Sequence, residues 1–331
     1  MITDDAFEDR VRALHDARDA AGVITLLENV ARTDLLQQPR RVFYMADAMR
    51  RLGRRDDALD LLRDASFSFD RRGNDELHRR RLNLEGAICF DTGRIADAEA
   101  VWRRLLDDAS DAGDAEYVAR ANHNLGAIYT LHIRSEEAIA AYERAMAAYR
   151  SMGNRRGLAQ CHHNLGLTYR ELEFAPKADA HFLQAIRYAI ADHSEDEIAR
   201  AEQERALLIY AARHDAPLAR VTANRALGRF SALQEHNGVG EVMRVLGLIE
   251  LGEKHDQKSR AHLRDALAHA EATRNPLLEA ETLEAVSVLE ERAGDMDAAY
   301  EIRARAQTLF RELGAIEWGK RERERVRALA S

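Results

Sequence analysis

Small and apolar residues recur at intervals of three and four along most of this 331-residue chain. That interval places side chains on one face of a helix. The clearest examples are two sets forty residues apart, Ala138, Tyr142 and Ala145 and then Ala178, Phe182 and Ala185. The pattern predicts a series of amphipathic helices, each with one buried face.

Each of these sets follows a nearly repeated heptapeptide. HNLGAIY begins at His123, and HNLGLTY begins at His163. Only the unit near Ala199 departs strongly from the frame. The chain is therefore predicted to be an array of helix–turn–helix units. Outside the two heptapeptides the frame continues through Ala46, Gly53, Ala58, Leu62, Gly86, Gly93, Ala98, Trp102, Leu246, Gly247, Leu263, Ala266, Gly294, Ala299 and Ala306.

Glycine and proline mark the same period. Gly73, Gly113 and Gly153 are spaced by forty residues, and His193 occupies the next multiple. Glycine suits the residue after a helix because it enters the left-handed region at little cost. Proline is tolerated in the first turn of a helix. The frame begins a helix at each proline of the chain, Pro39, Pro176, Pro217 and Pro276.

The order Leu-Gly, Tyr, then small, aromatic and small residues resembles the tetratricopeptide repeat. With forty residues per unit, the array is similar to the long repeats of kinesin light chains, LGN-type polarity scaffolds and bacterial Rap-type regulators. The resemblance covers residues 39–313. It implies an all-α fold, a right-handed superhelical α-solenoid of about eight stacked helix–turn–helix repeats plus a C-terminal capping helix.

The repeat frame predicts three regions. An atypical N-terminal helical pair caps the array over residues 1–38, and the array itself spans 39–313. A charged helix over 314–331 covers the final hairpin, with Ile316, Trp318, Val326 and Leu329 as its apolar residues. The units are expected to start near residues 39, 79, 119, 159, 199, 240 and 280.

One glycine position in the frame predicts that the two helices of a hairpin approach closely. It is held by Gly86, Gly126, Gly166 and Gly247. Ala138 and Ala178 are expected to supply the opposing small surface. Aromatic residues are expected to fill the gaps between successive hairpins, namely Tyr129, Tyr142, Tyr169 and Phe182.

The resemblance also implies a binding face. In this family the first helix of each hairpin lines a concave groove, which we expect to be open to a partner. Asn124 and Asn164 occupy equivalent positions there, and an amide can both donate to and accept from a peptide backbone. The same residues could instead bond neighbouring helices. Other candidates on this face are His123, His163, Asn83 and Gln203, the carboxylate-pairing Arg80, Arg120, Arg170 and Arg200, and the apolar contact Tyr210.

Charge narrows the choice of partner. The expected groove is mildly basic over most of its length and acidic at its C-terminal end, which favours an acidic segment of another protein. The whole chain has a net charge of −8, which argues against nucleic-acid binding. The basic C-terminal helix remains an alternative contact for an acidic partner or RNA.

Catalysis, metal binding and cofactors are not predicted. The chain has no GxxxxGK loop, HExxH pair or CxxC pair. His162 and His163 are adjacent, so their side chains diverge by about 100° on a helix. Cys89 and Cys161 lie in apolar helical patterns typical of packed, reduced thiols. No signal peptide is visible, and no apolar run approaches the roughly eighteen residues of a membrane-spanning helix. We expect a cytoplasmic protein.

Three functions remain open. The first is a non-catalytic adaptor that binds a peptide segment in its concave groove. The second is a ligand- or peptide-responsive regulatory sensor that changes the shape of its superhelix. Against it, the first 38 residues are too short for the separate effector bundle of Rap-type regulators. The third is a structural subunit of a larger bacterial complex, held through the convex face or an end.

Overall fold

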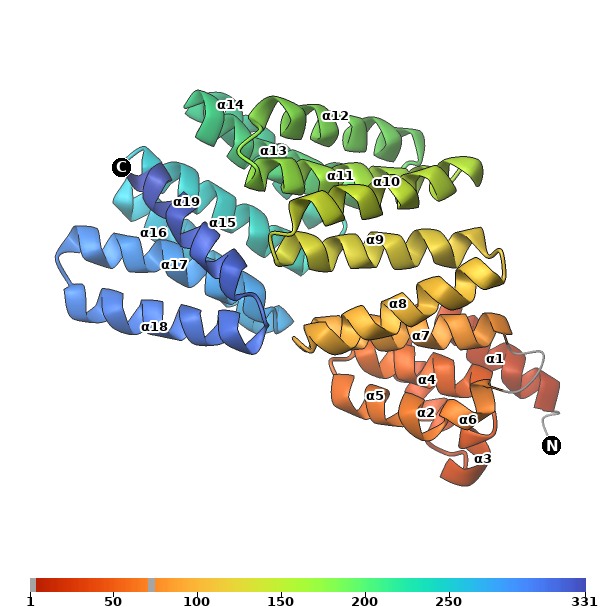
Figure 1. Cartoon of the computed structure of the whole chain (residues 1–331). Coiled ribbons are helices and arrows are strands. Elements are labelled where there is room, and N and C mark those ends of the chain that lie inside the picture. Colours follow the sequence, from red (N-terminus) through yellow and green to blue (C-terminus); the bar gives the residue numbers. More distant parts are fainter. Residues whose placement is uncertain (1–3, 71–74) are drawn as a thin grey trace. The chain divides into compact units, whose positions relative to one another are not determined.

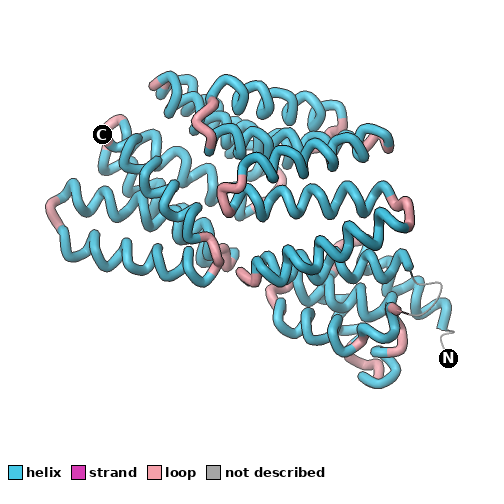
Figure 2. Tube along the Cα trace, viewed as in Figure 1, coloured by secondary structure: helices cyan, strands magenta, loops and turns pink. Residues whose placement is uncertain are grey.

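The computed structural model describes residues 4–70 and 75–331. Within these ranges every regular element is a helix and no strand occurs, which confirms the expected all-α fold of consecutive helix pairs. Gly73, the first of the three glycines spaced by forty residues, lies outside the described residues. Figure 2 shows that the loops between the longer helices are short.

The chain divides into two compact units, residues 1–121 and 122–331. The division falls inside α9 (Ala115–Leu131). We call the two parts the N-terminal unit and the C-terminal unit. The N-terminal unit also contains α1 (Asp4–Asp16), α2 (Ala20–Leu27), α3 (Arg32–Leu36), α4 (Pro39–Arg51), α5 (Arg55–Asp64), α6 (Ser66–Phe69), α7 (Asp75–Asp91) and α8 (Ile95–Asp111).

The C-terminal unit consists of consecutive antiparallel pairs followed by a single helix (Figure 1). The pair α13–α14 forms even though the repeat sequence is most degraded there. The helices are α10 (Ser135–Ser151), α11 (Arg155–Glu171), α12 (Ala175–Ala191), α13 (Glu195–Arg213), α14 (Ala216–Ala232), α15 (His236–Gly252), α16 (Asp256–Thr273), α17 (Pro276–Ala293), α18 (Met296–Glu312) and α19 (Ile316–Ala330).

The turns between helices fall where the forty-residue spacing of glycines predicts them. Gly113 and Gly153 have φ values of +67° and +66°, and His193 at the next multiple has +56°. All three lie just beyond the end of a helix, where a left-handed residue lets the last carbonyls be satisfied. Other turns adopt the same conformation without glycine, for example at Lys254 with φ +60°. All four prolines occupy the first or second position of a helix, in α4, α12, α14 and α17.

The glycines of the repeat lie against large side chains of the second helix in the same pair. A Cβ added to Gly126 would come within 2.6 Å of the Tyr142 ring, and one added to Gly166 within 2.5 Å of the Phe182 ring. Gly86 and Gly247 face Trp102 and Leu263 in the same way. This corrects the expectation that alanines oppose the glycines and that these rings fill gaps between hairpins.

The other residues predicted to form the repeat core differ in how deeply they are buried. Ala138 and Ala178 are fully buried, and Tyr129 is almost so. Tyr169 is half-buried, and its ring stacks on that of His181 in the second helix of the same pair, with centroids 5.2 Å apart.

The C-terminal helix α19 covers more than the final pair. It packs against α15 as well as α17 and α18, and Figure 1 shows it in dark blue across the first two. Its buried residues are Gly319, Glu322, Val326 and Leu329. Ile316, which the apolar pattern assigned to the contact, is 50% exposed, so Glu322 and not Ile316 belongs to the covered side.

Candidate functional site: the inner face of the C-terminal unit

The first helices of successive pairs contact one another in the order α11, α13, α15 and α17. We call their shared side, which carries Arg170, Glu204, Arg244 and Glu281, the inner face. Because α19 lies on α15 and α17, part of this face is already covered by the chain itself. This corrects the expectation of a groove open along its whole length.

Arg244 of α15 is at the centre of the covered region. Its Nη1 donates to Oε1 of Glu322 at 2.6 Å, and its Nη2 lies 3.1 Å from Oε2 of Glu281. Glu322 is 0% exposed, and Arg244 is nearly as buried. Trp318 donates its Nε1 hydrogen to Oε1 of Glu281 at 2.7 Å. A buried guanidinium is therefore shared by two buried carboxylates, one from α17 and one from α19.

Further polar contacts hold α19 along its length. Arg323 bonds Glu284 of α17 through two nitrogens, the shorter contact being 2.9 Å. Arg325 pairs with both Glu322 and Glu171, the last residue of α11. Arg292 of α17 donates to the carbonyl oxygen of Ala330 at 2.8 Å. Charged groups from α11, α15 and α17 thus converge on one helix.

Burial and neighbouring charge act differently on the two carboxyls beside Arg244. Burial raises the pKa of Glu281 to about 7 despite the opposing effect of Arg244. For Glu322, burial would also raise the pKa, but Arg244 and Arg325 outweigh it and the pKa lies below its ordinary value. Near neutral pH, Glu281 therefore changes its charge while Glu322 stays ionised.

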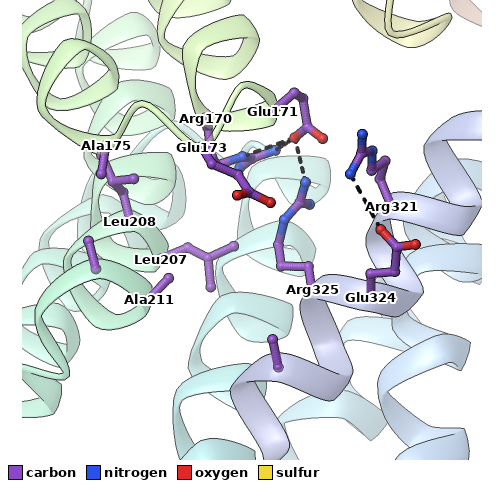
Figure 3. A pocket seen from close by; sticks show the side chains of 12 residues that line it. Arg170, Glu171, Glu173, Ala175, Leu207, Leu208, Ala211, Arg321, Glu324 and Arg325 are labelled. Carbon is purple, nitrogen blue, oxygen red and sulfur yellow. Dashed lines mark hydrogen bonds and ion pairs between the residues drawn. The ribbon is translucent and has the colours of Figure 1, made fainter.

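A cavity of about 400 Å³ lies between α11, α13 and α19. Leu207, Leu208 and Ala211 of α13 give it an apolar side. Figure 3 shows Glu171 and Arg325 side by side in its lining, joined by a dashed line that marks their ion pair. Such a combination of apolar surface and a few charged groups is typical of a ligand pocket.

The predicted Asn164 is engaged with neighbouring side chains. Its Nδ2 lies 3.4 Å from Nε2 of His123, and its side chain also hydrogen-bonds the Tyr142 hydroxyl. The other ring nitrogen of His123 lies 3.5 Å from the Sγ of Cys161. The structure therefore brings His123 and Asn164 together in a polar cluster between α9, α10 and α11. Asn124 is half-buried on α9.

A second group of predicted residues gathers around Glu204. Arg170 forms an ion pair with Glu204, and Gln203 donates to it at 3.2 Å. Burial lowers the pKa of His163, beside this group, to about 4, so its imidazole is neutral at physiological pH. Arg200 lies 3.5 Å from Glu235. Arg170 is the one predicted residue among those lining the cavity.

Two predicted contacts are not accessible. Gln203 and Tyr210 are each 3% exposed. The Tyr210 hydroxyl donates to Glu253 at 3.2 Å, and its ring packs where a Cβ on Gly252 would lie. This corrects the expectation that Tyr210 offers an apolar surface to a partner.

The remaining predicted residues belong to the N-terminal unit. Arg80 pairs with Glu76 at 2.8 Å and Arg120 pairs with Glu116 at 2.8 Å, both within one turn of their own helices. Asn83 is half-buried on α7. These residues are not part of the inner face of the C-terminal unit.

Sequence reasoning missed the contribution of α19. A usable signal was present, because Trp318, Glu322, Val326 and Leu329 are spaced by four, four and three residues and so share one helical stripe. A glutamate in the middle of an apolar stripe indicates a buried cationic partner. The identity of that partner, Arg244, required the fold.

Neither a metal centre nor a membrane segment is found in the parts of the chain that the structure describes. No group of three or more His, Cys, Asp or Glu side chains there could hold a metal ion. None of the helices over residues 4–70 and 75–331 is both long and apolar enough to cross a bilayer.

Consecutive packed helix pairs define a helical-repeat protein. Residues 81–151 match the model of the tetratricopeptide repeat, and this match confirms the resemblance expected from the heptapeptides and the glycine period. No curated protein sequence matches the chain.

The fold is shared with several solved structures. The Rap conjugation gene regulator of the plasmid pLS20, in complex with the Phr* peptide, has a TM-score of 0.68 at 15% identity, covering 85% of this chain and 77% of that one. A Rap protein complexed with Competence and Sporulation Factor has a TM-score of 0.68 at 14% identity, covering 97% and 96%. A STAND protein with a tetratricopeptide repeat sensor from Pyrococcus horikoshii has a TM-score of 0.57 at 14% identity, covering 95% of this chain and 48% of that one.

Proposed function

We propose that this chain is a non-catalytic binding protein that captures a peptide segment of another protein on the inner face of its C-terminal unit. The observation that carries the proposal is the cavity between α11, α13 and α19. Its apolar side at Leu207 and Leu208 can anchor one apolar side chain of a peptide. The charges at its rim can orient the flanking residues.

The charges favour a peptide with an acidic residue beside its apolar anchor. Arg321 borders the cavity, is about half exposed and pairs with the exposed Glu324 at 3.5 Å, whereas the pair of Glu171 and Arg325 is buried. A carboxylate of the peptide can therefore pair with Arg321 without breaking a buried bond. One structure of the same fold is in complex with the Phr* peptide and another is complexed with Competence and Sporulation Factor, which supports ligand recognition, and in the first case peptide recognition, as the function.

Selection from a random peptide library on the immobilised protein tests this proposal. Peptides enriched on the wild type should lose at least about tenfold in affinity for Ala211→Trp, because the indole fills the cavity. Ala261→Trp is the matched control, since Ala261 is an exposed position of α16 away from the cavity. Equal binding of the peptides to both variants would place their site elsewhere and reject the proposal.

The asparagine pair is tested with the same peptides. If Asn124 and Asn164 hold a peptide backbone, Asn124→Ala combined with Asn164→Ala abolishes binding and leaves the melting temperature nearly unchanged. If they bond neighbouring helices instead, as Asn164 does with His123 and Tyr142, the double variant melts earlier and still binds.

A regulatory sensor is the second candidate. The Rap protein complexed with Competence and Sporulation Factor is matched over nearly the whole of both chains, so the match includes the N-terminal region. This extent of the match supports the second candidate. Small-angle scattering with and without a saturating selected peptide distinguishes the candidates, because a sensor changes its dimensions on binding and an adaptor does not.

A further inference from the structure

The contact between α19 and the inner face combines a short apolar strip with several charged pairs. Of the four buried residues of α19, only Val326 and Leu329 are sizeable and apolar. The helix pairs differ, since the second helix of α11–α12 buries Ala178, Phe182, Ala185 and Ala189 and no charge. A helix added only to close the array would be expected to bury a comparable apolar stripe.

The charged pairs of this contact fix the position of α19 along the inner face but add little net free energy of stabilisation. Each buried charge loses its hydration, and the attraction between partners repays that loss only in part. The pairs Arg244–Glu322, Arg323–Glu284 and Arg325–Glu171 nevertheless require one position of the helix along the inner face. Residues 313–315 between α18 and α19 form a short connection, which keeps the local concentration of α19 high.

We infer that α19 is an internal, displaceable ligand of the inner face, and that the same surface takes a helical segment of a partner with the charge pattern of α19. That pattern is a glutamate for Arg244, an arginine in the next position for Glu284, and a second arginine two positions further for Glu171. The partner helix and α19 therefore compete for one place on α15 and α17. The existence of a partner rests on the proposed function, and the inference goes beyond it because the partner helix takes the place of α19 instead of entering the cavity beside it.

Release of α19 also changes the cavity. Arg321, Glu324, Arg325 and Ala328 form its α19 side. When α19 leaves, the apolar side at Leu207 and Leu208 and the charges at Arg244, Glu281 and Glu284 become one continuous surface. The free chain thus covers much of its own binding surface, and a partner gains access as α19 departs.

A peptide with the sequence of residues 314–331 tests the inference on the full-length chain. In the Arg323→Glu protein the chain's own helix is repelled from Glu284, while the added peptide keeps Arg323. We expect a fluorescent form of the peptide to bind this variant about tenfold more tightly than it binds the wild type. Lys320→Glu is the control with the same change of charge on the exposed side of α19, and it should leave the affinity of the peptide unchanged.

Hydrogen exchange of the wild-type chain gives a second measurement that needs no variant. Amides of α19 should exchange about tenfold faster in 1 M than in 0.1 M NaCl, and those of α11 and α12 should not change. The inference is overturned if α19 exchanges in step with α17 and α18 at both salt concentrations, or if the peptide binds the wild type and Arg323→Glu equally. Failure of the library selection alone would reject peptide capture but not the displacement of α19.

Discussion

The α11–α12 pair and the contact of α19 with α15 and α17 are held together in different ways. In the pair, Gly166 lets the Phe182 ring approach the backbone, and the surrounding alanines are fully buried. In the α19 contact, Arg244 satisfies two buried carboxylates. The first contact depends on shape and the second on charge. Salt and pH should have little effect on the close-packed α11–α12 contact, whereas both should weaken the ion pairs of the α19 contact. The two contacts can therefore be perturbed independently.

The largest expected effect is the loss of Arg244. Arg244→Met leaves Glu281 and Glu322 without their shared cation, which should cost about 3–5 kcal/mol of unfolding free energy. Arg264→Met removes an arginine that is largely exposed on α16 and should change stability by less than about 0.5 kcal/mol. Urea denaturation of both variants measures the difference, and similar midpoints would mean that Arg244 does not support the inner face.

Substitution of the close-packed glycine should have the next largest effect. Gly166→Ala places a methyl group 2.5 Å from the ring of Phe182, which is fully buried, and should cost about 1–3 kcal/mol. Gly228→Ala is the same change in α14 at a position with no atom near the added methyl, and should gain up to about 1 kcal/mol in helix propensity. Thermal melts that shift in the same direction would contradict packing by shape.

The pH dependence of stability distinguishes the two contacts further. The folded pKa of Glu281 is about 7, above the ordinary value of 4.5. Its stabilisation is therefore complete below pH 4.5 and is lost as the pH rises through 7. The lowered pKa of Glu322 acts oppositely, and its contribution is lost as the pH falls below 4.5.

We therefore expect stability to fall by about 2 kcal/mol between pH 5 and pH 8 from Glu281. Glu281→Gln should flatten this decline. Glu271→Gln, at an exposed position of α16, should leave the pH profile unchanged. A profile of the Glu281→Gln protein that superimposes on the wild type would show that another group titrates.

The smallest effect concerns the turns, which belong to neither contact. Lys254 is exposed and has φ +60°, so Lys254→Gly should stabilise the chain by about 1 kcal/mol. Lys258→Gly, four residues later inside α16, should destabilise it by about 1 kcal/mol. Both variants remove one exposed lysine, and calorimetry that finds equal shifts would assign the effect to charge and not to the backbone.

The repeat architecture could be predicted because its signals are local. The left-handed turns at Gly113 and Gly153 and the helix starts at the four prolines depend on a few neighbouring residues each. The side chain that packs against each repeat glycine is harder to predict, because an aromatic ring and an alanine one turn away both lie on the facing helix. The place of α19 depends on pairs such as Arg325 with Glu171, which are 154 residues apart. No periodicity specifies which of many arginines meets which glutamate.

The order of synthesis gives this long-range pairing a further consequence. Helices α11 to α18 can pair as they emerge from the ribosome, because each finds its partner within forty residues. Arg244 and Glu171 must wait for their partners Glu322 and Arg325 until α19 has been translated. During that interval the nascent chain presents an uncovered, charge-rich inner face, so its first opportunity to meet a competing helix comes before its own α19 has been made.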